Sequence, residues 1–158
     1  MGNYSGQQWN EVKLFARLQE ICSSEGVQAA QRLYEFAKRH NARFIWRSGP
    51  YGSITPRFLI EDNRVGVFTL EEWKDRTSKF GVSGKFVVNF EYLAKYGQVS
   101  IPILSRLAET LRTIPGVKKE YAELEKQHFL IRPPLSLDEI LARTSVVEQV
   151  EEALEVLL

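Results

Sequence analysis

The sequence predicts an α+β fold in which two helices come first, a four- to five-stranded antiparallel meander follows, and further helices end the chain. Apolar residues recur at helical spacing near both ends of the chain, and short runs rich in β-branched and aromatic residues fill the middle. The two patterns occupy separate stretches and do not alternate, whereas an alternating βαβ order would indicate a parallel sheet.

Length and composition indicate one domain over residues 1–158, with 1–24 as a peripheral helix and 145–158 as a docking or dimerisation helix. Most domains contain roughly 100–150 residues, and 44% hydrophobic with 26% charged residues is typical of a globular chain. The single cysteine, Cys22, excludes an internal disulfide, and no histidine or cysteine has zinc-ligand spacing. We therefore expect neither a metal nor a cofactor.

Two further features concern location and charge. The first residues, MGNYSGQQWNEVK, lack the basic and apolar segments of a secretory signal, and no apolar run approaches the roughly 20 residues of a membrane span. The expectation is a cytoplasmic protein without a membrane partner. The net charge of +1 conceals an asymmetry, since residues 135–158 hold six acidic residues and one basic residue. The body is therefore modestly basic and the C-terminal tail is acidic, which bears on partners.

Two adjacent helices are predicted at the N-terminus. The first, Gln7–Cys22, carries its apolar residues on one face and has Ser5 as a candidate cap. The second, Glu25–His40, follows Ser24, a residue type that caps helices. It is predicted to end at Asn41, because asparagine tolerates the left-handed conformation.

Four short runs in the middle of the chain are predicted to form the meander. A turn signal, Glu61-Asp62-Asn63, separates the second run from the third, and Lys74–Gly84 is predicted to be a loop. The four predicted strands are Arg43–Trp46, Thr55–Ile60, Arg64–Leu70 and Lys85–Phe90.

Further helices are predicted after the strands of the sheet. We expect a short edge strand at His128–Ile131 that Pro133-Pro134 stops, and a short helix, DEILAR, that Ser136 caps. The last helix keeps apolar residues at helical spacing up to the final residue, so it could pack on its own domain, dimerise or dock a protein partner. The predicted helices are Glu91–Tyr96, Ser100–Thr113 and Ser145–Leu158.

The stretch RFIWRSGPYGSITPR, residues 43–57, is the main candidate for a binding surface. From Lys38 to Arg57 there are five basic residues and no acidic residue, and Trp46 and Tyr51 lie among them. Guanidinium groups bind phosphate, aromatic rings stack on bases, and glycines let the backbone approach a ligand. This combination predicts contact with single-stranded or flipped DNA or RNA. The candidate binding residues are Arg43, Arg47, Tyr51, Arg57, Arg64 and Lys85.

A purely structural interpretation of the same stretch stays open. In a strand, Arg43 and Ile45 would face one way, whereas Phe44 and Trp46 would face the other. Trp46 could then belong to the core, and the basic residues could simply face water.

A third interpretation is a Mg²⁺-dependent nuclease that uses Asp62, Glu72 and Lys74. In restriction-type sites, carboxylates hold the metal ion and a lysine orients the attacking water. Acid-x-lysine triplets are common by chance, however, and Trp73 falls beyond the predicted strand. We therefore expect a chain that is not an enzyme, with no catalytic residue assigned.

Short motifs run through residues 26–158. They are Trp46…Gly49…Gly52-Ser53…Pro56, Gly66-Val67-Phe68-Thr69, Gly84-Lys85…Val88-Asn89-Phe90, Arg106…Leu111 and Arg132-Pro133. Together they resemble an uncharacterised α+β module appended to predicted restriction-like or defence-associated nucleases in bacteria. The resemblance implies an accessory or recognition role and carries over no catalytic residue. The leading hypothesis is thus a non-catalytic nucleic-acid-binding or defence-associated accessory domain, and the alternative is a protein-interaction or oligomerisation module.

Overall fold

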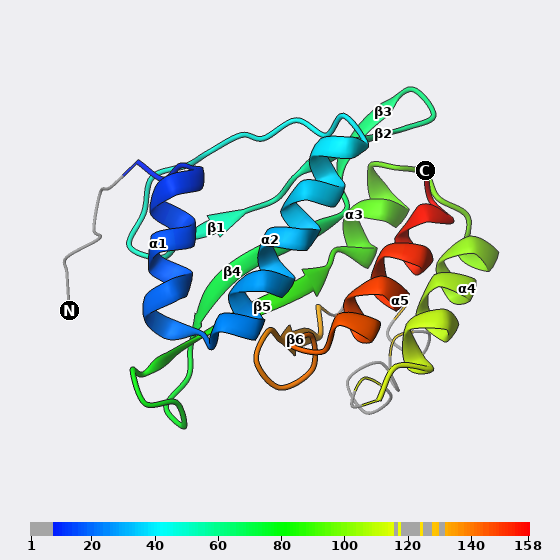
Figure 1. The fold of residues 1–158 in the computed structure, drawn as a ribbon. Helices are drawn as coiled ribbons and strands as arrows, with labels where there is room; N and C mark the ends of the chain where they lie inside the picture. Colours follow the sequence, from blue (N-terminus) through cyan, green and yellow to red (C-terminus); the bar gives the residue numbers. More distant parts are fainter. Residues whose placement is uncertain (1–7, 116, 118–123, 125–127, 130–131) are drawn as a thin grey trace.

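The computed structural model describes residues 8–115, 117, 124, 128–129 and 132–158, and it confirms the α+β fold (Figure 1). Two helices precede antiparallel strands, and helices close the chain. The helices are α1 (Glu11–Ile21), α2 (Ser24–Arg39), α3 (Phe90–Lys95), α4 (Ile101–Arg112) and α5 (Thr144–Glu155). The strands are β1 (Ser53–Ile54), β2 (Arg57–Ile60), β3 (Asn63–Gly66), β4 (Phe68–Lys74), β5 (Val82–Val88) and β6 (Pro134–Ser136).

The starts of α1 and α2 differ from the prediction because other residues cap them. The Asn10 side chain accepts a hydrogen bond from the Lys13 N–H at 2.9 Å, so α1 begins at Glu11, and Ser5 lies outside the described residues. The hydroxyl of Ser23, rather than that of Ser24, accepts the N–H of Gly26 at 3.1 Å. Asn41 adopts the left-handed conformation with φ 57°, as predicted.

The strand order is β1-β4-β5-β6, and β2 and β3 form a separate hairpin. This order differs from a simple meander, because the β2–β3 hairpin is inserted between β1 and β4, which pair with each other. The predicted run Thr55–Ile60 is interrupted at Pro56, which lacks an N–H donor, and only Arg57–Ile60 continues as a strand. The Glu61-Asp62 turn lies where the sequence predicts it.

Four local predictions are corrected. Arg43–Trp46 is extended and forms only an isolated bridge between Arg43 and Arg57. β4 continues to Lys74, so Trp73 lies within the strand. His128 and Phe129 have φ of 54° and 60°, which excludes a strand there, and residues 130–131 lie outside the described part. Pro134 begins β6 at the sheet edge rather than preventing it.

Ser136 caps a series of turns rather than the predicted helix DEILAR. Its hydroxyl accepts the N–H of Glu139 at 3.1 Å, which is the contact of a helix cap, but the chain continues as turns until α5. The cap was therefore predicted correctly and the helix was not.

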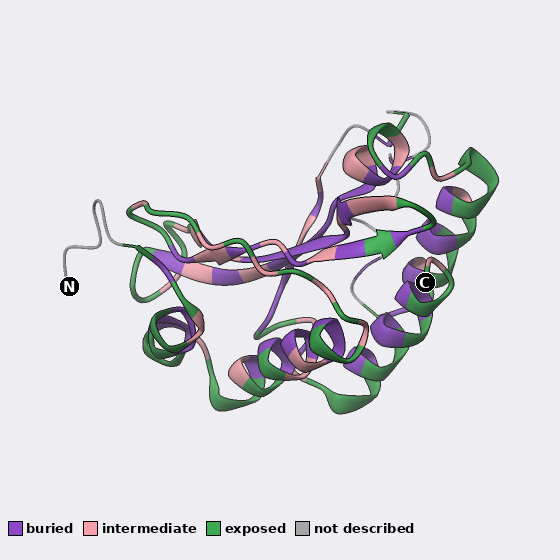
Figure 2. Cartoon of the chain, turned by 90° about the horizontal axis from the view of Figure 1, so that it is seen from above, coloured by how far each residue is buried: buried purple, intermediate pink, exposed green. Residues whose placement is uncertain are grey.

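The core lies between the sheet and the helices, and α1 and α2 cover one face of the sheet (Figure 2). Leu18 of α1, Leu33 and Phe36 of α2, and Leu70 and Phe86 of the sheet are fully buried. α1 therefore contributes side chains to the core. None of the helices among the described residues combines the length and the apolar composition of a membrane span.

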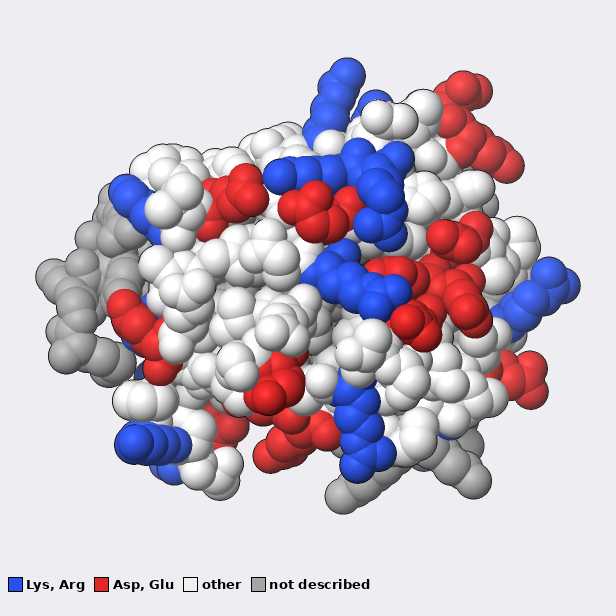
Figure 3. Space-filling view, in the orientation of Figure 1, with Lys and Arg blue, Asp and Glu red and all other residues white. Residues whose placement is uncertain are grey.

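The acidic helix α5 packs against α2 and α4. Its apolar face is buried within this domain, which leaves Val156 and Leu158 exposed at its end. Glu151 accepts a hydrogen bond from Arg32 Nε at 2.8 Å, and Glu148 lies 3.5 Å from Arg32 Nη1. Figure 3 shows basic and acidic side chains intermingled over this helical face. The acidic tail thus pairs with α2, while docking or dimerisation through residues 145–158 stays a prediction.

Candidate functional site

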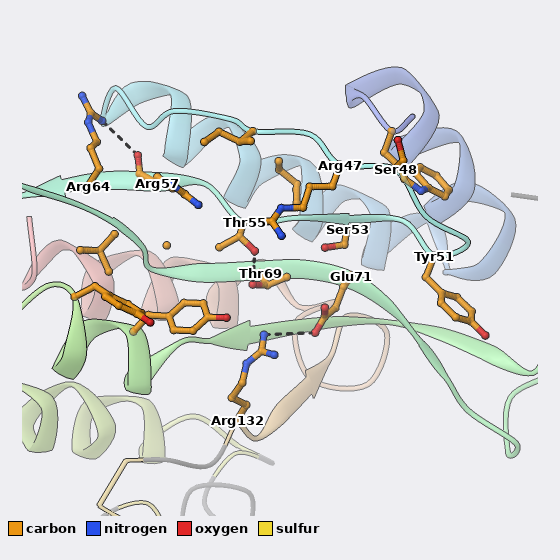
Figure 4. A pocket seen from close by; sticks show the side chains of 17 residues that line it. Arg47, Ser48, Tyr51, Ser53, Thr55, Arg57, Arg64, Thr69, Glu71 and Arg132 are labelled. Carbon is orange, nitrogen blue, oxygen red and sulfur yellow. Dashed lines mark hydrogen bonds and ion pairs between the residues drawn. The ribbon is translucent and has the colours of Figure 1, made fainter. Parts of the chain in front are cut away.

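A groove of about 700 Å³ lies on the sheet face that is turned away from α1 and α2 (Figure 4). On β4, Leu70 and Glu72 face the helices, because Leu70 is in the core and Glu72 bonds to Arg17 of α1. The alternate residues, Thr69 and Glu71, therefore face the groove. Trp9, segment 45–57, β3, α3 with its cap Tyr96, and the chain before β6 supply the rest of the lining.

Four arginines line this groove: Arg47, Arg57, Arg64 and Arg132. Arg47 and Arg57 enter from one wall and Arg132 from the opposite wall, as Figure 4 shows. Among the described residues, no carboxylate oxygen lies within 4.0 Å of the guanidinium group of Arg47 or Arg57. These two charges are therefore available to an anion.

The backbone that carries Arg47 and Arg57 is held in place on both sides. The Trp9 N–H donates to the Arg47 carbonyl at 3.1 Å, and the Trp9 indole Nε1 donates to the Gly49 carbonyl at 2.9 Å. Arg43 and Arg57 exchange two backbone hydrogen bonds of 2.8 Å. The side-chain alternation in this extended segment then exposes Arg47 and turns Trp46 inward.

Arg64 has a different role from Arg47 and Arg57. Its Nη1 donates to the carbonyl of Asn41 at 2.9 Å and to that of Arg57 at 3.3 Å. Arg64 therefore holds the end of α2 near β2, and it contributes charge to the groove while its donors are partly occupied.

The floor of the groove is a connected polar network. The hydroxyls of Thr55 and Thr69 lie 2.7 Å apart, and Asn89 Nδ2 donates to Thr69 Oγ1 at 3.1 Å and to the Gly66 carbonyl at 3.2 Å. Arg132 Nη2 donates to Asn89 Oδ1 at 3.1 Å. Since Asn89 is buried, this network fixes both the floor and the position of Arg132.

Glu71 is the one acidic residue that lines the described groove. Its Oε1 accepts a hydrogen bond from Trp73 Nε1 at 2.6 Å and lies 3.8 Å from Arg132 Nη2. Its other oxygen, Oε2, has no hydrogen-bond partner among the described residues. The groove thus offers an acceptor beside its donors.

Three tyrosines give the groove exposed aromatic surface. Tyr51 is 44% exposed and Tyr96 is 60% exposed, and the ring of Tyr92 on α3 lies 5.9 Å from that of Tyr96, the residue that caps the end of this helix. Trp46 is half-buried against the core, with its ring 6.4 Å from that of Tyr34. The structural interpretation is therefore correct for Trp46, and Tyr51 remains accessible.

Two predicted binding residues do not line the groove, although Lys85 lies directly opposite Glu71 on β5 and therefore on the same face of the sheet. Arg43 is exposed but does not line the groove. Lys85 lines a second hollow of about 380 Å³ together with Cys22 and Asp138. Burial, with a smaller effect of Asp138, raises the pKa of the Cys22 thiol to about 12, so this cysteine is a poor nucleophile at neutral pH.

The three nuclease candidates have separate surroundings. Asp62 lies in the β2–β3 turn and Lys74 is exposed at the end of β4. The buried carboxylate of Glu72 accepts from Arg17 Nε at 3.1 Å and from the Gly52 N–H at 2.7 Å. Within the described residues, no group of three or more His, Cys, Asp or Glu side chains could hold a metal ion.

Sequence reasoning missed Thr69, Glu71, Tyr92, Tyr96 and Arg132. Thr69 lies inside the predicted strand Arg64–Leu70 and Glu71 lies one residue beyond it, so a strand prediction extended to Lys74, read with its alternation, would have placed both on one face. Arg132 lies far along the chain from the other arginines, and no local pattern marks its place in the groove. In comparisons with known proteins, no family model, curated protein or solved structure matches this chain.

Proposed function

We propose that the groove binds single-stranded nucleic acid and that the chain is a non-catalytic recognition domain. The observation that carries this proposal is the presence of two guanidinium groups, of Arg47 and Arg57, without carboxylate partners in the described structure, beside exposed tyrosine rings. Phosphate groups complement the arginines, and bases complement the rings.

Charge supports an anionic ligand. Four arginines and one glutamate line the described groove, which leaves an excess of three positive charges there. The charge on the helical face is more balanced, because arginines of α2 are paired with glutamates of α5 (Figure 3). An approaching polyanion is therefore attracted to the groove side of the molecule.

Shape and aromatic surface support an unpaired strand over a duplex. Proteins usually read a duplex by inserting a helix or a β-ribbon into its major groove, whereas this site is concave. A volume of about 700 Å³ is within the range of pockets that enclose small organic ligands, roughly 300–1,000 Å³. The groove can thus enclose a short part of a strand, while Tyr51 and Tyr96 offer stacking surfaces worth about 1–3 kcal/mol per base.

Fluorescence anisotropy with labelled single strands of mixed sequence, in DNA and RNA arms, tests the proposal. We expect binding that weakens steeply between about 50 mM and about 200 mM salt, because phosphate neutralisation releases counterions. The double variant Arg47→Ala/Arg57→Ala should lose at least about tenfold in affinity, since hydrogen bonds to charged groups contribute about 1.5–3 kcal/mol each. The DNA and RNA arms show whether the 2′-hydroxyl contributes.

Arg106→Ala is the matched control, because Arg106 is exposed on α4 and does not line the groove. This variant should bind like the unmodified chain. Salt-insensitive binding, or an equal loss for Arg106→Ala and the double variant, would contradict the assignment of the groove.

A further inference from the structure

The position of Glu71 requires an explanation, because a carboxylate in a phosphate-binding groove repels the ligand backbone. Its side chain is only 17% exposed, so it lies within the groove wall rather than at the rim. The other polar residues that line the groove are arginines, serines, threonines and tyrosines, whose side chains can donate to an anion, and Lys85 lies directly opposite Glu71 on β5.

The described protein neighbours of Glu71 use only part of its hydrogen-bonding capacity. A carboxylate that serves only as an ion-pair partner of arginine makes short, often bidentate contacts. Here Arg132 Nη2 lies 3.8 Å from Oε1, and the same nitrogen donates to Asn89 Oδ1 at 3.1 Å instead. Trp73 Nε1 holds Oε1 at 2.6 Å, which fixes the orientation of the carboxylate. Oε2 is then a positioned acceptor without a described partner.

We infer that Glu71 reads the Watson–Crick edge of a guanine base in the bound strand, an inference that rests on the proposed function. A carboxylate presents acceptors only. Guanine is the one common base whose Watson–Crick edge carries two adjacent donors, N1–H and the N2 amine. Adenine and cytosine place a ring acceptor next to their amine, and uracil or thymine flanks its single N–H with two carbonyls. The acceptor pair of Glu71 therefore favours guanine over the other bases.

Arg132 completes the match to this edge. Guanine carries the acceptor O6 beside its N1–H donor, so a hydrogen-bond donor next to the carboxylate completes the contact. The guanidinium of Arg132, 37% exposed in its side chain, lies beside Glu71 and is held from below by Asn89. Tyr51 lines the same groove and offers an exposed ring on which a base can stack.

The test uses labelled strands of about ten nucleotides, a length within the site sizes of single-strand binders. The strands are poly-T or poly-U with one central position that carries guanine, adenine, cytosine or hypoxanthine. We expect the guanine strand to bind roughly tenfold more tightly than the adenine and cytosine strands, as for a good bidentate contact. Hypoxanthine keeps N1–H and O6 but lacks the N2 amine, so its strand should lose a large part of the preference.

Glu71→Gln supplies the protein-side test, because the amide keeps an acceptor for Trp73 Nε1 and removes the charge. The guanine preference should collapse, while affinity for the host strand without guanine should stay equal or rise, since a repulsive charge is gone. A merely structural role would lower all affinities together. Glu109→Gln, on the exposed face of α4 and outside the groove, should change nothing.

The outcomes distinguish failure of this inference from failure of the proposed function. Salt-dependent binding with equal affinity for all four strands overturns base reading and leaves nucleic-acid binding intact. A guanine preference that persists in Glu71→Gln, or that hypoxanthine fully retains, also overturns the role of Glu71. Absence of binding to every strand overturns both proposals.

Discussion

Arg17 Nε donates a hydrogen bond to Glu72 Oε2 at 3.1 Å, and the two side chains are only 5% and 1% exposed. The second oxygen of Glu72 accepts the Gly52 N–H at 2.7 Å. This pair therefore links α1 to β4 and to the loop before β1, on the opposite side of the sheet from the groove.

Removing one partner of this pair should destabilise the protein strongly. In Arg17→Met, the buried Glu72 carboxylate loses its cation, and we expect the free energy of unfolding to fall by about 3–5 kcal/mol. Urea unfolding followed by circular dichroism measures the change. The double variant Arg17→Met/Glu72→Gln should recover most of the loss, because glutamine still accepts from the Gly52 N–H without a buried charge. A double variant as unstable as Arg17→Met would contradict the role of the charge.

A methyl group at Gly66 should collide with the groove floor. A Cβ atom at this position would lie 2.5 Å from Thr55 Cγ2. We expect Gly66→Ala to lower the free energy of unfolding by about 1–3 kcal/mol, as overpacking does. Adding Thr55→Ser should restore much of this loss, because serine removes Cγ2 and keeps the hydroxyl that bonds Thr69. Denaturant titrations of both variants and of Thr55→Ser alone decide the point, and an unrepaired double variant would count against the collision.

Stability should decline at alkaline pH through Cys22. Burial raises the pKa of this thiol from 9.0 to about 12 in the folded protein, so the folded state retains a proton that the unfolded state loses. The contribution is fully present below pH 9.0 and disappears as pH rises from there towards about 12. The free energy of unfolding under reducing conditions, measured at several pH values in this range, should fall less steeply in Cys22→Ser. Equal slopes for the two proteins would contradict the assignment.

Elements whose signals are local could be predicted from the sequence. The apolar spacing of α4 and α5 depends on neighbouring residues alone. The same holds for the alternation of half-buried and exposed side chains that leaves Arg43 and Arg47 exposed. Helix starts were less predictable, because serine and asparagine both cap helices and only the fold selects between Ser5 and Asn10.

The candidate site could be predicted only in part, because long-range pairing assembles it. The segment that contains Arg47, Tyr51 and Arg57 was found by its composition. Glu71 enters the groove because β4 pairs with β1 across the inserted hairpin, and Arg132 enters because β6 pairs with β5. Neither pairing can be predicted from the residues next to Glu71 or Arg132 in the sequence.

The pairing of α5 glutamates with α2 arginines has a consequence for how a ligand arrives. Because Arg32 and Arg39 already face Glu148 and Glu151, these two charges on the helical side are compensated, whereas the described groove keeps an excess of three positive charges. On the proposed function, this uneven distribution of charge would orient an approaching nucleic-acid strand towards the groove before any contact forms.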